Sequence, residues 1–191
     1  MAEYKYELKI PKERIAVLIG KGGSIKKKIE IATSTKIEVD SKEGDVFISG
    51  TDSIRLYTTQ EVIKAIGRGF NPEIAMLLFK SDYAFELINI NDYIKSENGL
   101  TRLKGRAIGK EGKSRRIIED LTDTHISVYG KTIGIIGEVG NVMTSKKAVE
   151  SLLNGSKHSN VYSWLEKQKK NMKGLLEEDF KVKRTQIKRK P

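Results

Sequence analysis

The sequence predicts an α+β fold built from two copies of one small unit. A motif of the form apolar–Gly-x-x-Gly, followed by basic and apolar residues at helical spacing, occurs at residues 19–29 and returns 89 residues later at 108–118. The segments around both copies follow one order, which is strand, helix, loop, helix, strand, strand, helix. The copies align without a gap from residue 19 to residue 40 of the first. Such internal repetition indicates duplicated structural units.

The first unit begins with a strand at residues 4–10, where apolar and charged side chains alternate. Pro11 ends this strand and suits the first turn of a helix, so residues 12–19 are expected to be helical up to Gly20. The remaining elements expected in this unit are a helix over 24–33, strands over 36–40 and 45–49, and a helix over 51–66.

A connecting segment follows at residues 67–80, and a short apolar helix is expected around 74–78. This segment is too apolar for a free linker, so we expect it to be packed. The second unit is expected to have a strand over 83–90, a polar insertion over 91–99, helices over 101–108 and 113–122, strands over 125–129 and 132–136, and a closing helix over 139–153.

Beyond the second unit, residues 159–174 have the apolar spacing of an amphipathic helix around Trp164. We expect this helix to pack on the second unit, and a free partner-binding helix is the alternative. Residues 181–191 carry six basic side chains and no acid and are expected to be disordered. The chain is therefore divided into a first domain (1–70), a linker helix (71–82), a second domain (83–157), an amphipathic helix (158–175) and a basic tail (176–191).

Composition excludes several classes of protein. No apolar run approaches the ~18 to 20 residues of a membrane helix, and the absence of cysteine excludes disulfides and thiolate metal sites. A cytoplasmic protein without membrane contact is expected. The formal net charge is +11, and residues 156–191 hold 11 basic against 4 acidic side chains. This surplus indicates either a polyanionic partner or a solvated tail, and both interpretations stay open.

An enzyme is not expected. Residues 107–114 are similar to the phosphate loop of nucleoside triphosphatases, but Ala107 stands where that motif needs its first glycine, and the preceding segment is predicted to be a helix rather than a strand. The two histidines, His125 and His158, lie in separate elements and form no convincing metal cluster. No nucleophile–base pair stands out. We therefore expect neither cofactor nor metal.

The two Gly-x-x-Gly loops are suited to hold a nucleic-acid backbone. Glycines let a ligand approach the main chain closely, and the helix that follows presents unsatisfied N–H groups and partial positive charge. Lysines stand at the loop tips, and the adjacent strands offer an apolar wall for bases. The candidate binding residues are Ile19, Gly20, Lys21, Gly22, Gly23, Lys26, Lys27, Ile37 and Val39 in the first unit, and Arg106, Ile108, Gly109, Lys110, Glu111, Gly112, Lys113, Arg115, Arg116, Ile126 and Val128 in the second.

These loops and their flanking elements resemble the KH family, in which a GXXG loop clamps about four nucleotides. The element order is similar to the type I arrangement. The resemblance therefore implies two tandem type I KH domains, each a three-stranded antiparallel sheet packed on helices. The stretch from Arg106 to Glu119, together with the trailing helix near Trp164, is especially similar to the archaeal relatives of the Partner-of-Nob and Krr-type pre-rRNA-processing proteins.

This resemblance implies an RNA-binding factor for assembly of the small ribosomal subunit. It implies RNA rather than DNA, action near the 3′ end of 16S rRNA, and the Nob endonuclease, ribosomal proteins or translation factors as partners. Eukaryotic relatives tend to have a degenerate first loop, whereas residues 20–23 are intact here, so both units are candidates for RNA binding. Glu111 is expected to point to solvent, because an inward carboxylate would repel phosphate.

Other interpretations remain open. The chain could be a general KH subunit of another RNA-processing complex, although no stretch of strands supplies the additional barrel domain that such subunits usually carry. It could be a protein-interaction scaffold, which the two intact loops argue against, or the loops could be plain chain reversals. Steep salt dependence of RNA binding distinguishes the RNA-binding interpretations from a scaffold.

Overall fold

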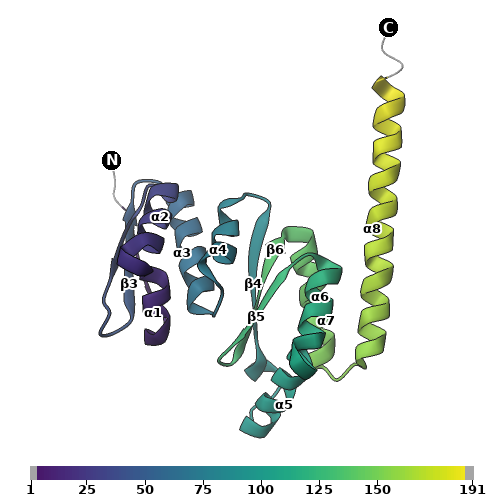
Figure 1. The fold of residues 1–191 in the computed structure, drawn as a ribbon, viewed down its shortest axis with the longest axis horizontal. Helices are drawn as coiled ribbons and strands as arrows, with labels where there is room; N and C mark the ends of the chain where they lie inside the picture. The colour runs from purple at the N-terminus through teal and green to yellow at the C-terminus, as the bar shows by residue number, and fades with distance from the viewer. Residues whose placement is uncertain (1–3, 188–191) are drawn as a thin grey trace.

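The computed structural model of the chain describes the backbone of residues 4–187 and the side chains of residues 4–172. It contains two three-stranded antiparallel sheets, each packed on helices of its own unit (Figure 1). The first unit consists of β1 (Tyr4–Lys9), α1 (Lys12–Ile19), α2 (Ser24–Thr33), β2 (Lys36–Val39), β3 (Asp45–Gly50) and α3 (Ser53–Gly67). The second consists of β4 (Tyr83–Asn89), α5 (Glu97–Ile108), α6 (Lys113–Thr122), β5 (His125–Tyr129), β6 (Thr132–Glu138) and α7 (Val139–Leu153). The predicted α+β fold is confirmed.

The last strand of each unit lies in the middle of its sheet, giving the orders β1-β3-β2 and β4-β6-β5. Strand alternation decides which side chains face the helices. Ile37 lies opposite Ile48, and Ile126 lies opposite Ile135, and all four belong to the buried cores. The strands β2 and β5 are edge strands, so one row of their backbone groups is left unpaired by the sheet.

Each unit has its own apolar core, made by one face of the sheet and the inner faces of the three helices. This arrangement follows from period-2 alternation in the strands and 3.6-residue periodicity in the helices. The largest fully buried side chains of the first core include Leu18, Ile29, Ile37, Ile48, Ile63 and Ile66, and those of the second include Ile90, Leu100, Ile118, Ile133 and Ile135.

The connecting segment packs against the outer face of the second sheet. It contains α4 (Pro72–Ala75) and a 3₁₀ turn (Met76–Phe79), and Phe70 just before it makes an edge-on contact with Phe85 of β4 at 6.0 Å between ring centroids. Gly134 of β6 makes room for this contact, because a Cβ there would lie 2.7 Å from the Phe70 ring. The two units are therefore joined by a packed interface, in agreement with the expected packed connection.

The first helix of the second unit begins earlier than expected. We expected a polar insertion over 91–99 and a helix from residue 101, but α5 starts at Glu97. The Ser96 hydroxyl accepts a hydrogen bond from the Gly99 N–H at 3.3 Å, which is an N-terminal cap, and Glu97 lies favourably in the first turn. The capping residue therefore decides the start of this helix, although the first turn is polar.

The last helix, α8 (His158–Ile187), has 30 residues and extends away from both units (Figure 1). Its first turns pack on the second core through Val161 and Leu165, as expected. The expected limit at residue 175, with disorder beyond it, is wrong for the backbone up to Ile187. Residues 175–187 contain no proline or glycine and are rich in helix-favouring Leu, Glu and Lys, so the helix has no local reason to stop. Residues 188–191 of the expected tail lie outside the described residues.

Within the part of the chain that the structure describes, no helix combines the length and the apolar character needed to cross a membrane.

Candidate nucleic-acid interface

The two Gly-x-x-Gly loops have the same backbone conformation. The first glycines, Gly20 and Gly109, have φ/ψ of 71°/175° and 74°/172°, a region that is essentially restricted to glycine. Space is restricted as well, since a Cβ on Gly20 would lie 2.5 Å from Ile25 Cγ1, and one on Gly109 would lie 2.7 Å from the Ser114 nitrogen. The loops are therefore tight turns that only this pattern of glycines permits.

A helix N-terminus follows directly after each loop. Gly23 and Gly112 are the capping residues of α2 and α6, and neither helix has a side-chain cap hydrogen bond. The N–H groups of Ser24 and Lys113 donate to the loop carbonyls of Lys21 and Lys110, and the N–H groups that follow in the first turn have no side-chain cap, so they can bind an anion, which the helix dipole also favours. Lys21 and Lys110 are exposed beside these N–H groups. The combination is an anion-binding site of the kind that holds phosphate.

Glu111 is exposed, in agreement with the expectation that it points to solvent. It adopts the left-handed conformation with φ of 53°, where a residue other than glycine pays about 1–2 kcal/mol. The Arg116 side chain compensates by donating from Nη2 to the Glu111 carbonyl oxygen at 2.6 Å. Arg116 therefore braces the second loop, in addition to placing a cation near it.

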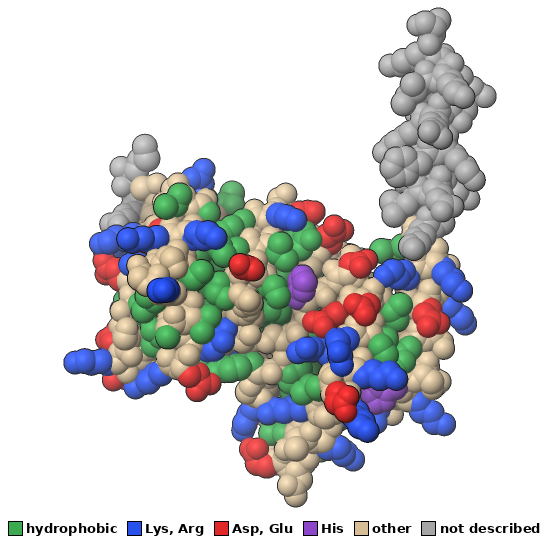
Figure 2. All heavy atoms as spheres, viewed as in Figure 1, with side chains coloured by type: hydrophobic (Ala, Val, Ile, Leu, Met, Phe, Trp, Pro, Cys, Tyr) green, Lys and Arg blue, Asp and Glu red, His purple; other side chains and the backbone are tan. Residues whose placement is uncertain are grey.

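The other predicted cations fall into two groups. Lys27 and Lys113 are exposed near the loops. Lys26 and Arg115 are half-buried and form ion pairs with glutamates one turn further along their helices, Lys26 Nζ–Glu30 Oε1 at 3.6 Å and Arg115 Nε–Glu119 Oε2 at 3.5 Å. Lysine and arginine side chains gather where α5 and α6 meet near the foot of α8 (Figure 2).

Arg106, predicted as a nucleic-acid contact, mainly holds helices together. Its guanidinium donates from Nε to the Leu152 carbonyl at 3.0 Å and from Nη2 to the Ser156 carbonyl at 2.6 Å. It therefore binds the C-terminal end of α7. In the first unit Arg14 does the same for α3, donating to the carbonyls of Ile66 and Phe70. Sequence reasoning missed this role because the two arginines occupy different positions in the aligned units.

The predicted apolar wall is wrong for two of its four members. Ile37 is 0% exposed and Ile126 is 6% exposed, because strand alternation turns both toward the helices. They pack beneath the groove and leave little side-chain surface for a base. Val39 and Val128 are half-buried, and so are Ile19 and Ile108 at the entrances of the loops. These four side chains remain available as apolar contacts.

Two glutamates that sequence reasoning did not select position the edge strands. Glu30 Oε1 accepts a hydrogen bond from the Ile37 N–H at 2.8 Å, and Glu119 Oε1 accepts one from the Ile126 N–H at 2.7 Å. Each carboxylate ties its edge strand to the helix that follows the loop, and so fixes the width of the groove between them. The signal was present in the sequence, since the two glutamates are 89 residues apart like the loops.

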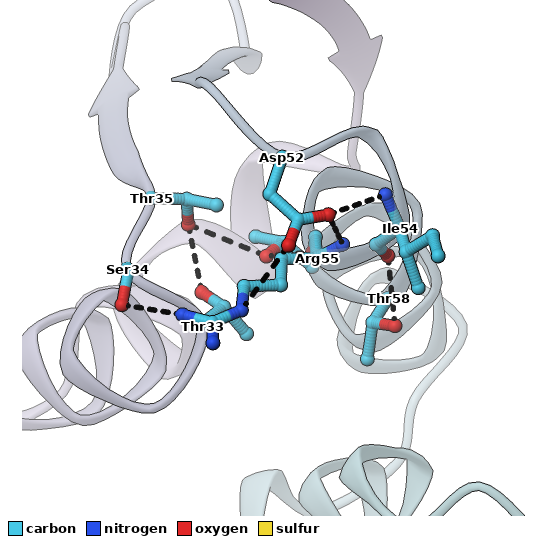
Figure 3. Close-up of polar contacts among 8 residues, drawn as sticks. Thr33, Ser34, Thr35, Asp52, Ile54, Arg55 and Thr58 are labelled. Carbon is cyan, nitrogen blue, oxygen red and sulfur yellow. Dashed lines mark hydrogen bonds and ion pairs between the residues drawn. The ribbon is translucent and has the colours of Figure 1, made fainter.

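A buried chain of hydroxyls repeats in both units. The Thr33 hydroxyl donates to the Ile29 carbonyl at 2.8 Å. It also bonds to the Thr35 hydroxyl (Figure 3), which in turn contacts Thr59 of α3. In the second unit Thr122, Thr124 and Ser145 form the corresponding chain. These hydroxyls connect the end of α2 or α6 to the start of the edge strand and to the third helix. They hold the groove walls rigid and satisfy polar groups that would otherwise be buried without partners.

The groove of the second unit is bordered by the first unit. A hollow of about 400 Å³ lies along β5, and its lining includes Arg115, Ile126 and Val128 of the second unit and Arg14 and Phe70 of the first. At its border, the Ser127 hydroxyl donates to the Arg68 carbonyl at 2.9 Å. The two units therefore build this side of the groove together.

The comparisons with known proteins agree with this geometry. Residues 5–68 match the family model described as KH domain, and residues 84–170 match the model described as eukaryotic type KH-domain (KH-domain type I). The chain is 49% identical over 170 residues to the KH domain-containing protein MJ0443 of Methanocaldococcus jannaschii, covering 87% of this chain and 74% of that one. It is 32% identical over 127 residues to the pre-rRNA-processing protein pno1 of Aspergillus oryzae, covering 64% of this chain and about half of that longer relative, 48%.

Solved structures give the same result. The crystal structure of Dim2p from Pyrococcus horikoshii is similar with a TM-score of 0.81 and 44% identity, over 86% of this chain and 99% of that one. In the crystal structure of the complex of a/eIF2alpha, aDim2p and rRNA from the same organism, the matching chain has a TM-score of 0.83 and 44% identity, over 88% and 96% of the two chains.

Proposed function

The chain belongs to the archaeal Dim2/PNO1-type proteins with two KH domains, and from this premise we propose that it binds single-stranded RNA at the 3′ end of the small-subunit rRNA during ribosome assembly. Its family makes the chain a KH RNA-binding homologue of pre-rRNA-processing proteins. Where on the RNA the chain acts, and which of its residues make the contact, are proposed from its own loops.

One observation carries the proposal: the second loop places Lys110 and Lys113 beside the uncapped N-terminus of α6. Phosphates of a single strand would bind the α6 N–H groups and these ammonium groups. The bases would then lie over Ile108 and Val128 toward the edge of β5. The Ile126 N–H points to Glu119, away from β6, and residues two apart in a strand share this direction. The backbone groups of Val128 therefore point into the groove, where they can bind base edges.

The first loop has the same backbone and an exposed Lys21, so we propose that it contacts RNA as well. Its surroundings are less basic, since the positions equivalent to Arg102 and Arg106 are Glu13 and Val17. The second unit is therefore proposed as the dominant site. This assignment supports a single strand that runs through the second groove.

The partners are proposed by similarity. The Pyrococcus relative forms a complex with a/eIF2alpha and rRNA, which supports RNA and a translation factor as partners of this chain. The Nob endonuclease and ribosomal proteins are proposed further partners. No catalytic step is proposed, because the KH family is normally non-catalytic.

The experiment is crosslinking of bound RNA in cells followed by sequencing, with the Lys110→Asp/Lys113→Asp double variant as the matched control. Reads concentrated at the 3′ end of the small-subunit rRNA, and lost in the double variant, are the expected result. Reads scattered over messenger RNAs would indicate a general KH RNA-binding protein and contradict the specific role at the small-subunit rRNA. Partner binding that persists in the double variant, without crosslinked RNA in either protein, would instead identify a scaffold.

A further inference from the structure

A second basic hollow lies behind the second loop, on the side of the foot of α8. Its volume is about 440 Å³, and its lining includes Arg102 of α5, Lys110 of the loop, Lys113 and Ser114 of α6, and His158 of α8. All the charged side chains in its lining are basic. It is separate from the groove along β5, which lies on the other side of α6 and is bordered by the first unit.

Ser114 gives this hollow an unusual property. The residue is 2% exposed, and its hydroxyl has no hydrogen-bond partner among the described residues. A buried hydroxyl without a partner destabilises the fold, so an apolar side chain would suit this position better unless a partner comes from outside. The hydroxyl lies in the second residue of α6, and Arg102 and Lys113 line the same hollow. An anion is the ligand that would use the hydroxyl and these cations together.

The first unit serves as an internal comparison, because its aligned positions lack these features. Ile25 stands where the second unit has Ser114, and Glu13 stands where it has Arg102. Ile25 is packed against the first core, as expected of a position without a polar ligand. The first unit therefore lacks the serine hydroxyl and the arginine that line the hollow of the second unit, although the two loops have the same backbone.

The foot of α8 closes the hollow and is held in place by specific contacts. His158 donates from Nε2 to the Arg106 carbonyl at 2.9 Å, and its ring makes an edge-on contact with Tyr162 at 6.0 Å between centroids. The Arg106 guanidinium in turn binds carbonyls at the end of α7 and before α8. The wall of the hollow is thus fixed by three helices, which favours a ligand-binding site over a transient gap.

We propose that this hollow binds a backbone phosphate of the RNA, beyond the stretch of about four nucleotides that a GXXG loop holds. This inference rests on the proposed RNA-binding function and extends it. The strand would pass over the second loop and place one further phosphate against Arg102, Lys113 and the Ser114 hydroxyl. Charge-assisted hydrogen bonds to phosphate are among the strong ones, so the contact adds affinity without reading the sequence.

The test compares short and extended RNA. A tiled set of tetranucleotides from the 3′ end of the small-subunit rRNA identifies the best-bound one, and two nucleotides are then added on its 5′ or its 3′ side. One of the two extended RNAs should bind the wild type about tenfold more tightly than the tetranucleotide does, which is the gain in affinity expected for one such contact. Arg102→Glu, which installs the residue of the first unit, and Ser114→Ala should each lose this gain, and each should weaken binding of the extended RNA more than binding of the tetranucleotide.

Two controls make the result specific. Lys167→Glu changes the charge equally on an exposed part of α8, nine residues and about 13 Å along the helix from His158, and it should retain the gain. A methylphosphonate linkage in the added segment, which removes one phosphate charge, should weaken binding to the wild type and leave the affinity for Arg102→Glu unchanged.

The outcomes separate this inference from the function on which it rests. If the wild type binds no single-stranded RNA, both are wrong. If it binds the tetranucleotide but neither extension adds affinity, or if both variants keep the gain, only the hollow is wrongly assigned. If the hollow binds inorganic phosphate but extending the RNA does not raise its affinity, the hollow is a site for a free anion and the proposed RNA contact is wrong.

Discussion

The hydroxyl of Tyr129 in β5 donates a hydrogen bond to the carboxylate of Glu13 in α1, and so connects the two units across 116 residues of sequence. Burial, together with the hydrogen bond to Glu13, raises the pKa of Tyr129, so the hydroxyl keeps its proton throughout the physiological range. Tyr129 lies on the edge strand of the second groove. The first unit therefore fixes the strand that the proposed RNA would meet.

The first prediction concerns the apolar part of this interface. Phe70 is buried against Phe85 and β6, so Phe70→Ala should lower the free energy of unfolding by about 3–5 kcal/mol, the usual cost of removing a buried aromatic side chain. Urea denaturation measures the change. Phe47→Ala is the matched control, since Phe47 is 44% exposed on the outer face of the first sheet, and it should cost less than about 1 kcal/mol. Equal costs would contradict a packed interface.

The second prediction separates the two glycines of the second loop. Gly109→Ala combines a conformation that is essentially restricted to glycine with a Cβ 2.7 Å from the Ser114 nitrogen, so it should destabilise the protein by about 3 kcal/mol or more. Gly112→Ala places its Cβ in open space with φ of 77° and should cost only about 1–2 kcal/mol. Thermal or urea unfolding gives both values. The test is whether Gly109→Ala lowers the free energy of unfolding more than Gly112→Ala does. The opposite result would show that the loop has another backbone conformation.

The third prediction concerns Glu119, whose carboxylate accepts the hydrogen bond from the Ile126 N–H. Glu119→Ala leaves that donor without its partner and should cost about 1–3 kcal/mol. Glu119→Gln keeps an acceptor oxygen and should recover most of the loss. Amide hydrogen exchange at Ile126 reports the bond directly, and exchange that is unchanged in the alanine variant would show that the strand is held by other contacts. Glu30 and Ile37 provide the same experiment in the first unit.

Much of the fold was predictable because glycines mark the ends of its elements. The helices before both loops end where predicted and the helices after them begin where predicted, since glycine at positive φ stops a helix and an uncapped N-terminus follows. The start of α5 differs from the prediction because Ser96 caps a polar first turn, and polarity alone predicts a loop. The end of α8 differs because basic composition predicts disorder, although helix propensity continues to Ile187.

The candidate site was predictable to a smaller extent. The loop residues and their flanking lysines follow from local sequence, whereas the direction of a strand side chain depends on the register. Ile37 and Ile126 were expected at the surface and are buried, because the pairing with β3 and β6 turns them inward. The bonds of Arg106 with the end of α7 depend on contacts 46 and 50 residues away, and no local pattern reports such distances.

The last prediction tests the second loop itself. Lys110→Asp together with Lys113→Asp should remove most of the affinity for single-stranded RNA and leave unfolding unchanged within about 1 kcal/mol, because both side chains are exposed. The salt dependence of RNA binding should also become weaker. Each lost phosphate contact reduces the magnitude of the slope of log K against log salt by about 0.7 for a single strand. The slope of the double variant should therefore be smaller in magnitude by about 1.4 if both lysines bind phosphates.

The matched control for this prediction is Lys167→Asp with Lys170→Asp, which changes the net charge by the same amount on an exposed face of α8. It should weaken binding only slightly and keep most of the slope, because long-range attraction is screened within about 10 Å at 0.1 M salt. Equal losses in both double variants would mean that net charge, rather than the loop, attracts the RNA. A folded Lys110/Lys113 variant that binds RNA normally would remove the loop from the site altogether.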